Sequence, residues 1–205
     1  WALDEKDRDF DKFLNVPIPP QAENGFVMPY GDCPLDKDKV GEQVYIDMLN
    51  RAQNYIYIMT PYLILDGELE NALKYAAERG VDVHIILPGV PDKYIPFSLA
   101  FTHYKSLLES GVRIFEYTPG FVHAKVFVGD DREAVVGTIN LDYRSLYDHF
   151  ECATYMWGTD CIPDIKNDFN YTQGKCREVT ADMLKKEPFK RRMLGFIAKA
   201  VAPLL

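Results

Sequence analysis

The chain has 205 residues, a length that suits one compact domain with a sizeable core and leaves little room for a second full domain. It is 47% hydrophobic and 13% aromatic, which is typical of a folded globular protein and excludes the disordered class. The formal net charge of −8 repels a polyanion at long range, so nucleic acid is disfavoured as the main partner.

The first 39 residues combine mixed charge with several prolines, which predicts a lead-in or linker on the surface. From Val40 the apolar spacing becomes regular, and helices alternate with strands. The predicted elements are a helix at 40–53, a strand at 55–60, a helix at 67–80, a strand at 81–88 and a helix at 97–110. Four strand-like runs follow at 112–117, 123–129, 133–138 and 150–157. This order predicts an α/β fold over residues 40–180, with a mixed β-sheet flanked by helices on both faces.

The end of the chain differs in charge from the rest. Residues 185–205 contain six basic side chains and one acidic side chain. Met193, Ile197 and Val201, with Leu194 beside them, can form one apolar stripe. We therefore predict a basic amphipathic helix over 181–205. The sequence leaves open whether this helix faces a membrane surface or docks on the domain with solvated lysines.

Four cysteines are spread through the chain without a C-x-x-C pair, so we expect reduced thiols and no structural zinc. They are Cys33, Cys152, Cys161 and Cys176. The sequence has no run of 18 or more apolar residues, and it begins at Trp1 with neither a start methionine nor a signal peptide. These features predict a piece of a longer protein that continues on its N-terminal side.

His123 and Lys125 lie two residues apart in a predicted strand, so their side chains are expected to project from the same face into one pocket. An imidazole nitrogen can attack phosphorus or transfer a proton, while an ammonium neutralises the non-bridging oxygens. This pair predicts chemistry on a phosphate ester that requires no metal.

A second polar set closes the next predicted strand. Thr138 and Asn140 share a face and carry a hydroxyl and an amide suited to a phosphate oxygen. Gly137 would let the backbone approach the anion closely. Glu151, in the last strand-like run, could fix the tautomer of a catalytic histidine through its second ring nitrogen.

His123, Lys125 and Asp130 form the pattern H-x-K-x4-D, and Gly-Thr-x-Asn follows after six intervening residues. This pattern resembles the phospholipase D superfamily. The likeness extends from about residue 28 to 205, where the segments are similar to the C-terminal half of bacterial cardiolipin synthases. The resemblance implies two such halves in one chain, each giving one histidine-lysine motif to a single site. Only the second motif is present here, because His103 and Lys105 lie in a predicted helix and would not share a face.

The resemblance implies transfer of a phosphatidyl group between two phosphatidylglycerol molecules, with release of glycerol, through a phosphohistidine and without a cofactor. It favours His123 as the acid/base partner and leaves either histidine open as the nucleophile. Lys125 and Asn140 would hold phosphate oxygens, and Thr138 would line the same pocket. Glu151 would orient the histidine that the other half supplies.

Two further residues have two interpretations each. Asp130 is either catalytic or the cap of the acidic turn that it begins. Tyr62 either lines the mouth of the pocket, as a substrate-binding residue, or is a core aromatic. Asp142 and Arg144 are expected to pair and brace the loop after Asn140.

Two alternatives to the cardiolipin synthase half remain. One is a phosphodiesterase in which two copies of the chain, each with a single motif, rebuild the site by two-fold symmetry. The other is a non-catalytic module that binds anionic lipid through the basic tail. The expected partners are phosphatidylglycerol or another anionic phospholipid, a membrane surface, and the missing N-terminal half or a second copy. The resemblance places the full-length protein at the bacterial cell membrane, and the piece itself is expected to be soluble.

Overall fold

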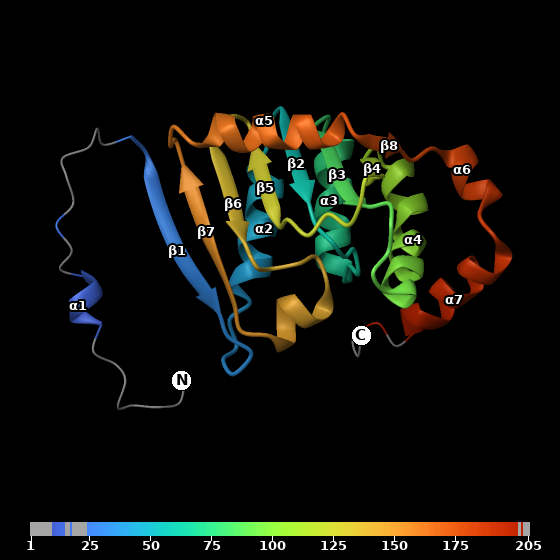
Figure 1. Cartoon of the computed structure of the whole chain (residues 1–205), viewed down its shortest axis with the longest axis horizontal. Helices are drawn as coiled ribbons and strands as arrows, with labels where there is room; N and C mark the ends of the chain where they lie inside the picture. The colour runs from blue at the N-terminus through green and yellow to red at the C-terminus, as the bar shows by residue number, and fades with distance from the viewer. Residues whose placement is uncertain (1–9, 15–16, 18–23, 201, 203–205) are drawn as a thin grey trace.

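The computed structural model describes residues 10–14, 17, 24–200 and 202. These residues form an α/β fold around one mixed sheet of eight strands, as the sequence predicts (Figure 1). The strands lie side by side in the order β1-β7-β6-β5-β2-β3-β4-β8. Their bounds are β1 (Phe26–Asp32), β2 (Tyr55–Met59), β3 (Asp82–Pro88), β4 (Arg113–Tyr117), β5 (Val126–Gly129), β6 (Glu133–Gly137), β7 (Glu151–Trp157) and β8 (Cys176–Glu178).

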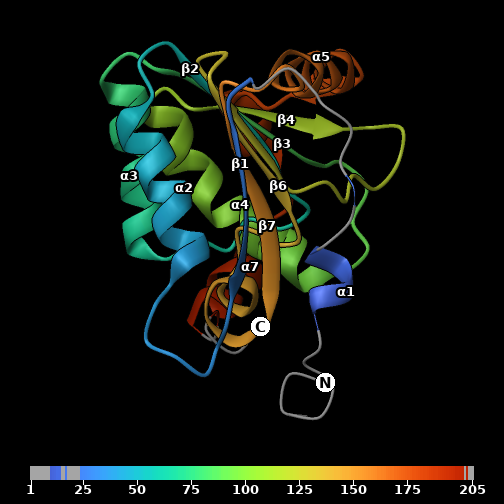
Figure 2. The ribbon, with the colours of Figure 1, turned by 90° about the vertical axis from the view of Figure 1, so that its left-hand side faces the viewer.

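The helices separate into two layers. Figure 2 shows the sheet nearly edge-on, with α2, α3 and α4 on one face and α5 against the upper part of the other face. The helical segments are α1 (Asp11–Leu14), α2 (Val40–Arg51), α3 (Gly67–Glu78), α4 (Tyr94–Glu109), the π-helical turn η2 (Arg144–Asp148), α5 (Ile162–Gln173), α6 (Ala181–Lys186) and α7 (Phe189–Ala200). Helices therefore lie on both faces, and α5 contacts β2, β4, β5 and β6 on one of them.

The main core lies between the sheet and the layer of α2, α3 and α4. Its centre is the stacked pair of Tyr45 from α2 and Phe127 from β5, whose ring centroids are 3.9 Å apart. The Tyr45 hydroxyl donates to the backbone oxygen of Ile139 at 2.9 Å. This bond connects α2 with the segment that follows β6, which carries the polar residues of the predicted pocket.

The predicted lead-in of residues 1–39 contains a strand that the sequence did not indicate. Strand β1 pairs antiparallel with β7 at the edge of the sheet, with Pro29 opposite Thr154. A proline cannot donate to a ladder, and it is tolerated at a sheet edge because one side of the strand has no partner there. Residues 1–9, 15–16 and 18–23 of the predicted lead-in lie outside the described residues.

The basic end of the chain forms two helices, so the prediction of one helix over 181–205 is corrected. Pro188 separates α6 from α7, and Glu187 before it has the extended angles φ −61° and ψ 137°. The ring of a proline disfavours the helical conformation for the preceding residue, which explains the break. Val201 of the predicted apolar stripe lies outside the described residues.

Candidate active site

The histidine and lysine of the motif converge at the start of β5. Lys125 Nζ lies 3.1 Å from Nδ1 and 3.0 Å from Nε2 of the His123 ring, and it donates to the His123 backbone oxygen at 2.8 Å. The two residues precede the strand, which begins at Val126 and not at residue 123 as predicted. The expectation that both side chains point to one place is confirmed, although both residues precede the strand.

The environments of the two side chains differ. His123 is exposed, whereas Lys125 is only 8% exposed. Burial lowers the pKa of the Lys125 ammonium, and the nearby carboxylates of Glu151 and Asp142 act in the opposite direction. The site therefore presents an accessible imidazole in front of a cation that is partly withdrawn from water.

Strands β5, β6 and β7 are antiparallel neighbours, so the start of β5 adjoins the end of β6. The end of β6 brings Gly137, Thr138 and Asn140 into the same open hollow of about 450 Å³ as His123 and Lys125. The sequence therefore identified five residues that the structure gathers in one place. Gly137 also has a packing role that the sequence did not indicate. A Cβ at this position would lie 2.4 Å from the Ala153 Cβ, so the glycine permits close packing against β7.

Asn140 is held by a residue that sequence reasoning missed. Its Nδ2 donates to the Ser145 hydroxyl at 2.9 Å, and the Ser145 backbone N–H donates to Asp142 at 2.8 Å. The Asn140 Oδ1 is buried and has no hydrogen-bond partner among the described residues. Burial raises the pKa of the Asp142 carboxyl, and bonds from Ser145 and Asn140 oppose this rise. Asp142 thus braces the loop through Ser145, and the expected partner Arg144 is exposed.

Glu151 is connected to the hollow through Thr138. The Thr138 hydroxyl donates a short hydrogen bond to the Glu151 carboxylate, and it accepts from the Cys152 backbone N–H at 3.0 Å. The other carboxylate oxygen of Glu151 lies 3.6 Å from His149 Nδ1. The Thr138 hydroxyl also lies 3.2 Å from the Cys152 backbone oxygen, so Thr138 connects Glu151 with the backbone of β7 beside the hollow.

The family model described as "Cardiolipin synthase, PLD-like domain" matches residues 45–172, which is more than half of the chain and includes the whole hollow. The chain belongs to this family of the phospholipase D superfamily. Two curated relatives are named cardiolipin synthases. A cardiolipin synthase of Alkalihalophilus pseudofirmus is 32% identical over 94% of this chain, and cardiolipin synthase 2 of Bacillus anthracis is 35% identical over 84%.

An uncharacterised protein of Streptococcus mutans serotype c is 59% identical over the full length of the chain. The chain spans 44% of that protein, 38% of the Alkalihalophilus protein and 34% of the Bacillus protein. It therefore corresponds to less than half of each of these relatives.

Solved structures share the fold at low sequence identity. The phospholipase D family member Nuc from Salmonella typhimurium has a TM-score of 0.65 at 16% identity, and the match covers 76% of this chain and 99% of Nuc. Phosphatidylserine synthase from Haemophilus influenzae has a TM-score of 0.66 at 19% identity, covering 87% of this chain and 48% of that one. The fold thus matches nearly all of one protein and about half of the other.

Asp130, the last position of the family pattern H-x-K-x4-D, lies outside this hollow, at the opposite end of β5. Its carboxylate accepts from the backbone N–H groups of Gln53, Asn54 and Tyr55 at 2.7, 2.8 and 2.9 Å. Asp130 and Asp131 have φ values of 52° and 54°, so both lie in the left-handed region, in the turn that joins β5 to β6. Of the two interpretations of Asp130, its placement favours the turn cap.

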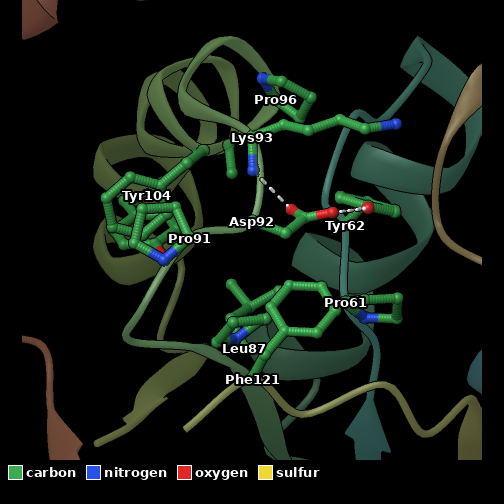
Figure 3. A pocket seen from close by; sticks show the side chains of 12 residues that line it. Pro61, Tyr62, Leu87, Pro91, Asp92, Lys93, Pro96, Tyr104 and Phe121 are labelled. Carbon is green, nitrogen blue, oxygen red and sulfur yellow. Dashed lines mark hydrogen bonds between the residues drawn. The ribbon is translucent and has the colours of Figure 1, made fainter.

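Tyr62 lines a narrow crevice beside the hollow (Figure 3). Its hydroxyl donates to Asp92 at 2.5 Å, and burial together with this bond raises its pKa. Phe121, in the same crevice, links the two features, because its ring centroid lies 6.3 Å from that of Tyr62 and 5.8 Å from that of His123. Phe121 is a second residue of the site that the sequence did not indicate, since an aromatic residue two positions before a histidine carries no pattern.

The second histidine-lysine pair in the chain is structural, as expected. His103 is buried in α4 and pairs with Glu70 at 2.8 Å, whereas Lys105 is exposed and lies 3.7 Å from Glu109. All four cysteines are free. In the part of the chain that the structure describes, no group of three or more histidine, cysteine, aspartate or glutamate side chains could hold a metal ion. Within the same residues, none of the helices has both the length and the apolar character needed to cross a bilayer.

Proposed function

We propose that this chain provides one catalytic half of a cardiolipin synthase, which transfers a phosphatidyl group between two phosphatidylglycerol molecules at the bacterial cell membrane. The observation that carries the proposal is the convergence of His123 and Lys125 in an open hollow beside Asn140. Membership of the cardiolipin synthase family supports the choice of lipid substrates.

The reaction requires two histidines, and each step then balances. In the first step one imidazole nitrogen forms a bond to phosphorus, the bond between phosphorus and the glycerol oxygen breaks, and the other imidazole protonates the departing glycerol. In the second step this imidazole takes the proton of a hydroxyl group on another phosphatidylglycerol. That oxygen attacks phosphorus and the nitrogen–phosphorus bond breaks. The sum is two phosphatidylglycerols converted to cardiolipin and glycerol.

Lys125 would stabilise the charge that develops on the non-bridging oxygens. Its ammonium is already close to the imidazole and partly withdrawn from water, so little reorganisation is needed as the transition state forms. Asn140 would act beside it. A half-turn of its amide directs an N–H toward the side where Oδ1 now lacks a partner, and the Ser145 hydroxyl accommodates either orientation because it both donates and accepts.

The other histidine would come from a second phospholipase D-like unit. The hollow adjoins a second open hollow over β1, β6 and β7, lined by Tyr30, Val136 and Thr154 among others, so this face of the sheet has room for a partner. The chain spans less than half of its curated relatives, which supports a partner half in the same longer protein. The match to nearly all of Nuc supports a second copy of the chain as the alternative, with phosphodiester cleavage as its activity.

The test is to measure cardiolipin formation from labelled phosphatidylglycerol by two proteins. The first is this chain alone, and the second is the Streptococcus mutans protein with its matching segment replaced by this chain. The proposal predicts product from the chimera and none from the chain alone. Phosphodiester hydrolysis by the chain alone, with a dimer in sedimentation, would favour the second-copy alternative. A chimera that is folded but makes no cardiolipin would overturn the proposal.

A further inference from the structure

Helix α7 docks on the domain by one face. Gly195 lies so close to α4 that a Cβ would be 2.2 Å from the Ser98 backbone oxygen, and Ala198 packs against Leu99. Arg191 is buried in the same interface. Its guanidinium lies 3.9 Å from the centroid of the Phe97 ring and pairs with Glu187 at 3.0 Å. This face accounts for the attachment of the helix.

The opposite face of α7 is apolar and exposed. Phe189, Met193, Phe196 and Ile197 are 75%, 49%, 77% and 58% exposed. At about 100° per residue, these four side chains fall within one stripe that points away from the docked face. A helix that only covered the domain would be polar on this side. The stripe is therefore a second apolar surface for which nothing in the described structure provides a partner.

Basic side chains flank this stripe on both sides. Lys190 lies along one edge, Arg192 and Lys199 lie along the other, and all three are exposed. They stand out in a chain whose net charge is −8. An apolar stripe between two rows of cations is complementary to a surface with negative headgroups and an apolar interior.

The position of α7 relates this surface to the candidate active site. Both views place α7 and the start of β7 at the lower side of the molecule (Figures 1 and 2). Ala198 and Ala202 pack in one cluster with Ile64 and with Tyr143, which follows the loop that holds Asn140. Helix α7 therefore packs against the segment of the chain that follows Asn140.

We propose that α7 binds an anionic phospholipid surface and lies in the plane of the interface, with the stripe of Phe189, Met193, Phe196 and Ile197 among the acyl chains. The cations beside the stripe contact the headgroups. The size of the stripe argues against a second protein as its occupant. A helix of 12 residues is about 18 Å long and about 10 Å wide, so one face offers on the order of 200 Å². A stable protein interface needs ~800 Å² from each partner.

The test is sedimentation of the chain with vesicles of neutral phosphatidylcholine, and with vesicles in which about a third of the lipid is phosphatidylglycerol. The double variant Phe189→Ser/Phe196→Ser should bind anionic vesicles roughly tenfold to a hundredfold more weakly, because two aromatic rings no longer leave water. Its fold should persist because both rings are exposed, and circular dichroism checks this. Tyr171→Ser is the matched control, since Tyr171 is an exposed aromatic on α5 and should not affect binding.

The electrostatic part has its own variant. Lys190→Gln/Arg192→Gln should lose roughly fivefold in affinity for each charge at low salt, and this difference should vanish at ~1 M salt. His123→Ala should bind vesicles like the wild type, so failure of the catalytic proposal leaves this result unchanged. Equal binding by the wild type and the serine variant, or equal binding to neutral and anionic vesicles, would overturn the inference. Self-association that Phe196→Ser abolishes would assign the stripe to a second copy and also overturn it.

Discussion

Replacing Asp130 with alanine should destabilise the fold. The carboxylate accepts three backbone hydrogen bonds, from Gln53, Asn54 and Tyr55. Hydrogen bonds to a charged group are worth roughly 1.5–3 kcal/mol each, but this turn is partly exposed and water can replace part of them. Alanine also loses about 1 kcal/mol at the positive φ of this position. Together these effects should lower the free energy of unfolding by about 2–4 kcal/mol.

Urea denaturation of the 205-residue chain measures this loss. Asp130→Asn should lose less, because asparagine tolerates a positive φ and keeps one acceptor oxygen. Asp131→Ala is the matched control. Asp131 has a similar φ, but its carboxylate accepts from the Tyr55 hydroxyl and from Lys166 and not from the backbone. Asp131→Ala therefore measures the cost of alanine at a positive φ together with the loss of an exposed ion pair. If Asp130→Ala unfolds with the same free energy as the wild type, the assignment of Asp130 to the turn is wrong.

Three further predictions concern other parts of the molecule. Burial, and then the hydrogen bond with Asp66, raise the pKa of the Glu42 carboxyl from 4.5 to about 7. Between these two pH values the carboxyl is protonated in the folded state and ionised in the unfolded state. The free energy of unfolding should therefore fall as pH rises from 4.5 to 7 and stay reduced above pH 7. Glu42→Gln should remove this pH dependence and raise the free energy of unfolding by about 2 kcal/mol at pH 8, measured by urea denaturation. Gly195→Ala should push α7 away from α4 and lower the free energy of unfolding by about 1–3 kcal/mol. The variant should melt at a lower temperature and be cleaved faster within α7, and an unchanged rate of proteolysis would refute this prediction. Thr138→Val should reduce the chimera's cardiolipin synthesis by roughly tenfold, because Glu151 loses its donor, while Thr138→Ser should retain activity.

Local spacing was sufficient to predict the residues that the hollow gathers. His123 and Lys125 are two residues apart and converge, while Ala124 between them packs against a hydrophobic cluster. The alternation of a strand therefore holds although the strand begins later. Thr138 and Asn140 follow the same rule at the end of β6. In both pairs the direction of the side chains depends on residues close in sequence, so the sequence pattern alone predicts it.

The residues that were missed or misplaced depend on contacts across the fold. Ser145 holds Asn140 only because a π-helical turn returns its hydroxyl to the loop, and no periodicity marks that turn. Strand β1 is defined by pairing with β7, more than a hundred residues away, while its own proline and glycine argue against a strand. Pro188, by contrast, is a local signal, and it should have divided the predicted C-terminal helix.

The measurement that tests the central claim most directly is cardiolipin synthesis by the chimera carrying His123→Ala. His149→Ala is the matched control, since this nearby histidine is exposed and lies 3.6 Å from the Glu151 carboxylate. If the His123 imidazole takes part in phosphoryl transfer, His123→Ala should reduce the rate by roughly a thousandfold or more, and His149→Ala should stay within about tenfold of the wild type. A folded His123→Ala chimera that forms cardiolipin within about tenfold of the wild-type rate would contradict the account.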